Sequence, residues 1–310
     1  MRKHVRLVGL IGLSLLLNGC SFFNVSTQST AIKNTTISSR LPVFNQLNVN
    51  GRINLRLMTQ SSKSMVTLHG DPRDLAAVKI KVLHHKLFIR VRPSYPRFSR
   101  IDLELTSPYI NAIEYHGSGM INGTLTTKLL DLVVNNQGET NLQGTIGLRK
   151  LTVNGNGQLQ ISGIRSPQLL ATISGAPKIK LAGEVALTHL EMNNNGWLSA
   201  YWLKSKRLQV RGRKKSFIQL AGVVDNLDLE LWDKSQFYGR YLRATEAFVK
   251  THNRSVAKIT AIDKQHTLAS DNSSIHFYHN PQVHTDFMAF NGAVLDLREW
   301  TLPFIEHQGD

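Results

Sequence analysis

The stretch Leu151-Thr-Val-Asn-Gly-Asn-Gly-Gln-Leu-Gln-Ile-Ser-Gly163 decides the fold, because it contains the pattern that repeats along the chain. On both sides of its Gly-Asn-Gly segment, apolar residues alternate with polar ones. Alternation by two is typical of a strand that buries one of its faces. Glycine and asparagine tolerate the positive φ that a sharp corner needs. The stretch therefore predicts two short strands joined by a tight turn.

The same pattern recurs along the chain with steps of 18 to 20 residues. One apolar column consists of Val134, Val153, Ile173, Met192, Val210, Leu229 and Val249. A second apolar column consists of Leu142, Ile161, Leu181, Ala200 and Leu220. Two residues after each member of the second column lie Gly144, Gly163, Gly183, Trp202 and Gly222. A register of turn formers falls at Gly155, Gly175, Asn194 and Gly212.

Self-similarity at a fixed period is the signature of a stacked architecture. One coil cannot bury its own apolar face, so coils must stack and pair edge to edge. The handedness of parallel crossovers favours a right-handed coil. We therefore predict an all-β fold, a right-handed parallel β-helix with single-stranded coils of about 19 residues. The alternative is an antiparallel sandwich or barrel, which also places turns every eight to twelve residues.

The composition is strongly basic, with 37 Lys and Arg against 21 Asp and Glu in 310 residues. Such an excess favours acidic partners or surfaces. The single cysteine, Cys20, excludes an internal disulfide framework.

The first 20 residues resemble a bacterial lipoprotein signal. Met1 to Arg6 is positively charged, and Leu7 to Leu17 is apolar but too short to span a bilayer as a helix. The run ends in Leu17-Asn-Gly-Cys20. The resemblance implies removal of the leader and lipidation of Cys20. Because Ser21 follows the cysteine, it also implies a lipid anchor in the outer membrane, with the protein facing either the periplasm or the outside.

We divide the chain by composition and pattern. A signal peptide over residues 1–20 is followed by a flexible tether over 21–42, rich in Ser, Thr, Asn and Gln. Short alternating strands predict an N-terminal β cap and first coils over 43–112. The β-helix repeats are expected over 113–297, and a tail over 298–310.

Over about residues 43–297 the sequence resembles the putative auto-transporter adhesin, head GIN domain family. The resemblance lies in short segments: Phe44–Gly51, Ile53–Leu55, Val78–Ile80, Leu87–Ile89, His116–Gly119, Asn154–Gly157 and Tyr278–Pro281. It implies a right-handed β-helix in a bacterial envelope protein of unassigned function, with no catalytic set to transfer. The family's Gly-Ser-Gly turn is replaced at Asn193–Gly196 and Arg211–Arg213, which leaves the later corners less defined.

The stretch Trp197–Lys215 is the candidate ligand-binding region, because it combines aromatic rings with many cations. Alternation predicts that Arg207, Gln209 and Arg211 share an outer face. Cations beside aromatic planes suit acidic glycans or lipopolysaccharide, and we do not expect nucleic acid as a partner. The alternative is a solvated basic corner. The candidate residues are Trp197, Tyr201, Trp202, Arg207, Arg211, Arg213, Lys214 and Lys215.

We expect no catalytic residue, metal or cofactor. His276, His279 and His284 lie near Asp286, but the first two differ in parity and no second motif completes a site. Asp228 and Glu230 share the outward parity of a solvated strand face. The expected function is adhesin-like, non-catalytic binding of a glycan or polyanionic surface. The alternatives are a carbohydrate-active enzyme of the polysaccharide lyase kind and a structural envelope component; the oligomeric state stays open.

Overall fold

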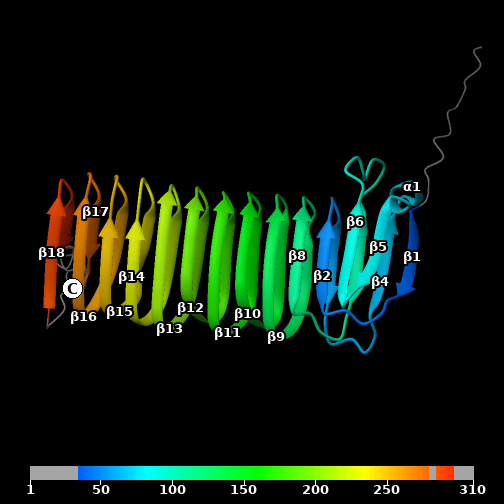
Figure 1. Ribbon diagram of the computed structural model, residues 1–310, viewed down its shortest axis with the longest axis horizontal. Coiled ribbons are helices and arrows are strands. Elements are labelled where there is room, and N and C mark those ends of the chain that lie inside the picture. The colour runs from blue at the N-terminus through cyan, green and yellow to red at the C-terminus, as the bar shows by residue number, and fades with distance from the viewer. Residues whose placement is uncertain (1–33, 279–283, 297–310) are drawn as a thin grey trace, which may run out of the picture. The chain divides into compact units, whose positions relative to one another are not determined.

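The computed structural model describes residues 34–278 and 284–296. These residues form 19 strands and one short helix, and all of the strands belong to a single sheet. The sheet is wound into a β-solenoid of about nine turns, with coils of about 19 residues. Figure 1 shows the coils stacked beside one another in chain order from β8 to β18. The predicted all-β parallel solenoid is therefore confirmed, and the antiparallel sandwich is wrong.

The regular coils are long strands that each pair in parallel with the next. They are β9 (Ile121–Asn136), β10 (Glu139–Gly155), β11 (Gln158–Gly175), β12 (Lys178–Asn194), β13 (Trp197–Lys214), β14 (Phe217–Leu231), β15 (Gln236–Thr251) and β16 (Val256–Ser270). Two shorter strands, β17 (Ser274–Phe277) and β18 (His284–Phe290), pair with β16, and β19 (Ala293–Asp296) pairs with β17. The coils thus continue to the end of the described residues.

Each long strand bends near its middle, and we call the halves before and after this bend the first arm and the second arm. The second predicted column lies in the first arm, and its five members pair with one another from coil to coil. The residues two positions later all have a positive φ and form the bend. The sequence prediction for this column and its corners is confirmed.

The first predicted column holds up to Met192 and then shifts. Val134, Val153, Ile173 and Met192 are in register, but Val210 pairs with Leu190 and not with Met192. The cause is a longer bend in β13. Val185 pairs with Leu203 and His189 with Gln209, so a step of four residues in β12 corresponds to a step of six residues in β13.

The turn register shifts for the same reason. Gly212 lies within β13 opposite Met192, and Lys214 takes the turn position opposite Asn194 with a φ of 62°. The prediction of a turn at Gly212 is wrong, because it did not allow for the two additional residues across the preceding bend.

The N-terminal cap closes the first coils with antiparallel strands. β1 (Thr35–Arg40) pairs with β4 (Met65–Gly70), β4 pairs with β7 (Asp102–Thr106), and β5 (Val78–Leu83) pairs with β6 (Lys86–Val91). Between the cap and the regular coils, β2 (Gln46–Asn50) lies between β6 and β8 (Ala112–Gly117), and β3 (Asn54–Met58) lies between β7 and β9. A single helical turn, α1 (Pro72–Leu75), follows β4.

Part of the predicted tether is a strand. Residues 35–40 form β1, although all six side chains are exposed. The reason is the edge of β4, whose backbone groups would otherwise lack strand partners, so β1 is held by its ladder and not by side-chain burial. Residues 1–33, which include the predicted signal and Cys20, lie outside the described residues, as do the predicted tail and His279. Within the described residues, the structure contains no helix that could cross a membrane.

Candidate ligand-binding groove at the bend of the coils

The eight predicted binding residues are distributed around one coil and do not form one surface. Trp197 begins the first arm of β13, Tyr201 and Trp202 lie at its bend, and Arg211 and Arg213 lie on the second arm. Lys214 and Lys215 lie at the turn. Of the eight, Trp202 and Arg207 line one hollow, and Lys214 and Lys215 line another.

Trp197 belongs to a ladder of rings on the outer side of the first arm. Its ring stacks on Phe217 with centroids 6.3 Å apart, and Phe217 stacks on Tyr238 at 4.8 Å. Lys178 lies over one end of this ladder and Lys258 over the other. Since stacking covers ring faces with neighbouring rings, Trp197 presents mainly its edge to a ligand. Its role here is to join adjacent coils.

Arg211 is neutralised by two acids on the next coil. Its guanidinium lies 3.0 Å from Asp228 Oδ1 and 3.2 Å from Glu230 Oε2. Burial raises the pKa of Asp228, but the hydrogen bonds and charge of Arg211 outweigh burial and leave that pKa below its ordinary value. Arg207, Gln209 and Arg211 do share the outer face, as alternation predicts, yet the charge of Arg211 is already paired.

The remaining predicted cations of the second arm and the turn have other surroundings. The guanidinium of Arg213 lies 4.1 Å from the ring centroid of Trp232, whose other neighbour in the stack is His252. Lys214 and Lys215 line a hollow of about 600 Å³ at the turns, together with Asp233 and Asp271. Lys234 and Arg254 also line this hollow, so its four cations exceed its two carboxylates, but no aromatic ring is among its described lining residues.

A larger hollow, of about 1120 Å³, lies at the bends of β11 to β14, and we call it the bend groove. Trp202, Lys204, Lys206 and Arg207 of β13 line it together with residues of the adjacent coils. The long bend of β13 places these cations there, because its two additional residues fall between Leu203 and Gln209. The other lining residues are Pro167, Gln168, Glu184, Ala186, Thr188, Leu203, Ser205, Gly222, Val223 and Asp225.

Trp202 is the unusual residue of the bend groove. It has a φ of 65°, whereas the corresponding corners of the neighbouring coils are Gly183 and Gly222. A left-handed backbone at a bulky residue costs on the order of 1–3 kcal/mol and often marks a functional position. The side chain is 77% exposed, and no aromatic ring or cation among the described residues stacks on it. Most of the surface of this residue is therefore open to a ligand.

The charges of the bend groove are unpaired and predominantly positive. Lys204, Lys206 and Arg207 form no ion pair with a described residue. Glu184 and Asp225 are the acids among the described lining residues, which leaves three positive charges against two negative ones. Sequence reasoning missed Val223, which is 50% exposed beside this cluster, because the columns predict buried positions and give no signal for exposed apolar ones.

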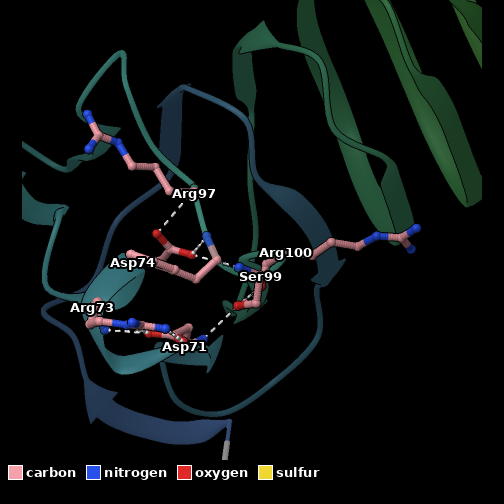
Figure 2. Close-up of polar contacts among 7 residues, drawn as sticks. Asp71, Arg73, Asp74, Arg97, Ser99 and Arg100 are labelled. Carbon is pink, nitrogen blue, oxygen red and sulfur yellow. Dashed lines mark hydrogen bonds and ion pairs between the residues drawn. The ribbon is translucent and has the colours of Figure 1, made fainter. Parts of the chain in front are cut away.

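A second basic cluster, Arg90, Arg92, Arg97 and Arg100, lies at the end of β6 and in the loop before β7. This loop is held by Asp74, whose buried carboxylate accepts hydrogen bonds from the backbone N–H groups of Arg97, Phe98 and Ser99 at 2.8–2.9 Å. Figure 2 shows Arg97 and Arg100 pointing away from one another on either side of the loop. The loop is fixed, and Arg97 and Arg100 both line a hollow of about 600 Å³ with Arg52 and Glu139, whereas Arg90 and Arg92 are not among its described lining residues.

No metal site emerges in the described part of the chain. No group of three or more His, Cys, Asp or Glu residues there could hold a metal ion. His276 donates to or accepts from Ser274, and burial followed by the charge of Lys258 lowers its pKa. This histidine therefore has a local partner within its own strand.

Together, the stacked coils and the bend groove define the chain as a β-solenoid with an open, cationic groove at the edge of its coils. The family model of the putative auto-transporter adhesin, head GIN domain, matches residues 43–189. Over these residues the resemblance seen in the sequence is confirmed. Similarity to an adhesin-like family indicates a cell-envelope or surface protein.

Solved structures match the chain at low sequence identity and with TM-scores below 0.5. A putative adhesin from Parabacteroides merdae is 13% identical, with a TM-score of 0.47, and the match covers 85% of this chain and 96% of that one. A putative adhesin from Parabacteroides distasonis is 14% identical, with a TM-score of 0.44 and coverage of 85% and 97%. A putative lipid binding protein from the same species is 11% identical, with a TM-score of 0.44 and coverage of 85% and 96%. None of the curated proteins matches the chain.

Proposed function

We propose that this chain is a lipid-anchored envelope protein that binds acidic glycans in the bend groove without transforming them. The observation that carries the proposal is Trp202, an exposed indole held at a corner where the adjacent coils have glycine. Protein folding alone gives no benefit from an exposed ring on a strained backbone. Ligand binding does benefit from such a ring, because its exposed apolar surface can pack against a ligand.

The chemistry of the groove suits a sugar acid. The C–H-rich face of a pyranose ring packs on an indole face, which buries apolar surface on both sides. Lys204, Lys206 and Arg207 then lie within the same hollow to pair with carboxylate or sulfate groups. A neutral glycan would make the first kind of contact and lack the second.

A non-catalytic role is supported by the state of the acids that could serve an enzyme. Asp228 is held ionised by Arg211, which makes it a poor proton donor. Asp233 accepts a hydrogen bond from the backbone N–H of Lys214 at 3.0 Å and lies at the turn, away from the bend groove. Neither of these two acids lines the bend groove, so neither would meet a glycan bound there. The acids of the groove itself, Glu184 and Asp225, come from different coils, β12 and β14.

The test compares two tryptophans of the same strand. Trp202→Gly removes the exposed ring at a corner that accepts glycine, and Trp197→Leu removes a ring that is stacked within the fold. Binding is measured to immobilised heparin, polygalacturonate and neutral dextran at 50 and 300 mM salt. We expect binding to an acidic polymer only, weaker at high salt, and at least tenfold weaker in Trp202→Gly but not in Trp197→Leu.

Two results would overturn the proposal: equal binding of dextran and the acidic polymers, or wild-type affinity in Trp202→Gly. Unfolding in urea shows whether each variant is folded at the assay temperature. The lipid anchor is tested separately by expressing Cys20→Ser in cells. Retention of this variant in the membrane fraction, at the level of the wild type, would argue against anchoring through Cys20.

A further inference from the structure

A second hollow lies at the bends of the earlier coils, and neither the family nor the sequence pattern assigns it. Its volume is about 780 Å³, and it is lined by residues that include Tyr109, Lys128, Leu129, Gly147 and Arg165. Lys128 and Leu129 come from the bend of β9, Gly147 from the bend of β10 and Arg165 from the bend of β11. We call it the proximal hollow because it lies toward the N-terminal cap.

The proximal hollow and the bend groove meet on β11. Arg165 lines the first and Pro167 lines the second, and both residues are exposed while Ser166 between them is buried. Residues two apart on a strand project to the same side and lie about 7 Å apart. The strand register supports this continuity. Ile164, next to Arg165, pairs with Ile146 of β10, and Ser166, next to Pro167, pairs with Val185 of β12.

The two hollows therefore follow one another along a single edge of the solenoid, from β9 to β14. Parallel neighbours lie about 4.8 Å apart, so five steps between six strands give a length of roughly 24 Å. A surface of that length exceeds what one or two sugar rings can contact.

The proximal hollow also has the same chemistry as the bend groove. Lys128 and Arg165 form no ion pair with a described residue, and no acid is among the described residues that line the hollow. Leu129 and Tyr109 are about half exposed there, so apolar surface is again available beside positive charge. At Gly147 a side chain would collide with the carbonyl oxygen of Lys128, so glycine keeps the floor of the hollow free.

We infer that the two hollows are subsites of one track and that the ligand is a linear acidic polysaccharide lying along the stacking direction of the coils. This inference rests on the proposed function and adds the class of ligand: a polymer bound along its length, not a chain end or a small sugar acid. Each subsite contributes a weak contact, and a rigid solenoid presents both at once, which raises affinity through effective concentration.

The experiment is a length series of heparin-derived oligosaccharides of 2 to 12 sugars, measured by calorimetry with the full chain. For the wild type, we expect the affinity to rise at least tenfold with length and then to reach a plateau. In the double variant Lys128→Gln, Arg165→Gln, the rise with length should disappear while binding of the shortest binding oligomer stays unchanged. Trp202→Gly should weaken binding at every length.

Arg149→Gln provides the matched control, because Arg149 belongs to the neighbouring coil but is ion-paired with Asp131. It should retain the full length dependence. The inference is overturned if affinity does not depend on length, or if the double variant binds long oligomers as the wild type does while Trp202→Gly still weakens binding. If no oligosaccharide binds the wild type, or Trp202→Gly has no effect, the proposed function itself fails and the track fails with it.

Discussion

Trp202 and Gly222 lie at equivalent corners of adjacent coils, two residues after the paired core residues Ala200 and Leu220, and both have a positive φ, of 65° and 141°. Glycine adopts this backbone without steric cost, whereas tryptophan does not. Gly222 therefore suits the fold at its corner, whereas Trp202, at the equivalent corner one coil earlier, is a residue that folding does not favour.

Replacing Trp202 by glycine should therefore leave the fold intact. Relief of the left-handed backbone strain is partly offset by the greater freedom of glycine in the unfolded chain. We expect Trp202→Gly to be between about 0 and 2 kcal/mol more stable than the wild type, as measured by urea unfolding followed by circular dichroism. A clear loss of stability would show that the indole supports the fold and would weaken its assignment to a ligand.

The converse substitution should be severe at a glycine corner. At Gly183, which has a φ of 135°, a Cβ atom would collide with the carbonyl oxygen of Ile164 on the preceding coil. We expect Gly183→Ala to lower the free energy of unfolding by at least about 2 kcal/mol, from strain and from separation of two coils. At Gly292 an added Cβ would also approach the backbone of the preceding coil, at Ala269, but less closely, and this glycine does not have a positive φ. Gly292→Ala should therefore cost less, and equal losses at both sites would contradict this explanation.

The buried serines of the turns offer a matched pair. Ser216 and Ser235 are both fully buried, but the hydroxyl of Ser235 lies 2.7 Å from the carbonyl oxygen of Trp232, whereas the hydroxyl of Ser216 has no hydrogen-bond partner among the described residues. Removing a bonded hydroxyl costs about 1 kcal/mol, while removing a buried unpaired one is neutral or stabilising. We expect Ser235→Ala to shift the urea midpoint down and Ser216→Ala to leave it or raise it. A loss at Ser216 as large as that at Ser235 would indicate a partner for its hydroxyl.

Periodicity predicts the fold well because a solenoid repeats its contacts. Leu142, Ile161 and Leu181 are in register as predicted, since each coil buries the same position against the next. The same reasoning fails beyond Met192, because spacing alone does not show where a coil gains residues. The two additional residues of β13 fall in its bend, and a residue count from one column to the next cannot distinguish a longer bend from a shifted strand.

The site was harder to predict than the fold. Alternation shows which side chains point outward, but not which side of the coil they occupy, so Trp197 and Trp202 looked alike in the sequence. A usable signal did exist: Trp197, Phe217 and Tyr238 recur at steps of 20 and 21 residues, within two residues of the coil length, and such recurrence predicts stacking between coils. Trp202 lacks an aromatic residue at that spacing. The buried role of Asp74 has no comparable signal, because its partners are backbone N–H groups.

Asp74 should make stability depend on pH. Burial raises the pKa of its carboxyl, but three backbone N–H donors outweigh burial, and the pKa lies below its ordinary value. A lowered pKa means that the ionised group stabilises the fold above its ordinary pKa, and that this contribution is lost as the pH falls through the lowered value. Asp74→Asn should cost about 2–4 kcal/mol at pH 7 and should show a smaller further loss of stability between pH 5 and pH 2.

Urea unfolding at pH 7, 5 and 2 measures this dependence, and Glu139→Gln serves as a control for removing one negative charge from an exposed position. If the wild type and Asp74→Asn lost stability in parallel on acidification, the carboxylate would not be the acid-sensitive group of the cap.

Arg207 and Arg211 allow the two roles of the basic strand to be separated, because they are the same residue type four positions apart on one face. Arg211 is paired with Asp228 and Glu230, while Arg207 lines the bend groove without an ion pair to a described residue. Arg211→Gln leaves two partly exposed acids without their cation and should lower stability by roughly 0.5–1.5 kcal/mol, with little effect on heparin binding. Arg207→Gln should leave stability within about 0.5 kcal/mol of the wild type and should weaken both heparin binding and its salt dependence. If Arg211→Gln weakened binding more than Arg207→Gln did, the ligand would lie on the second arm and not in the bend groove.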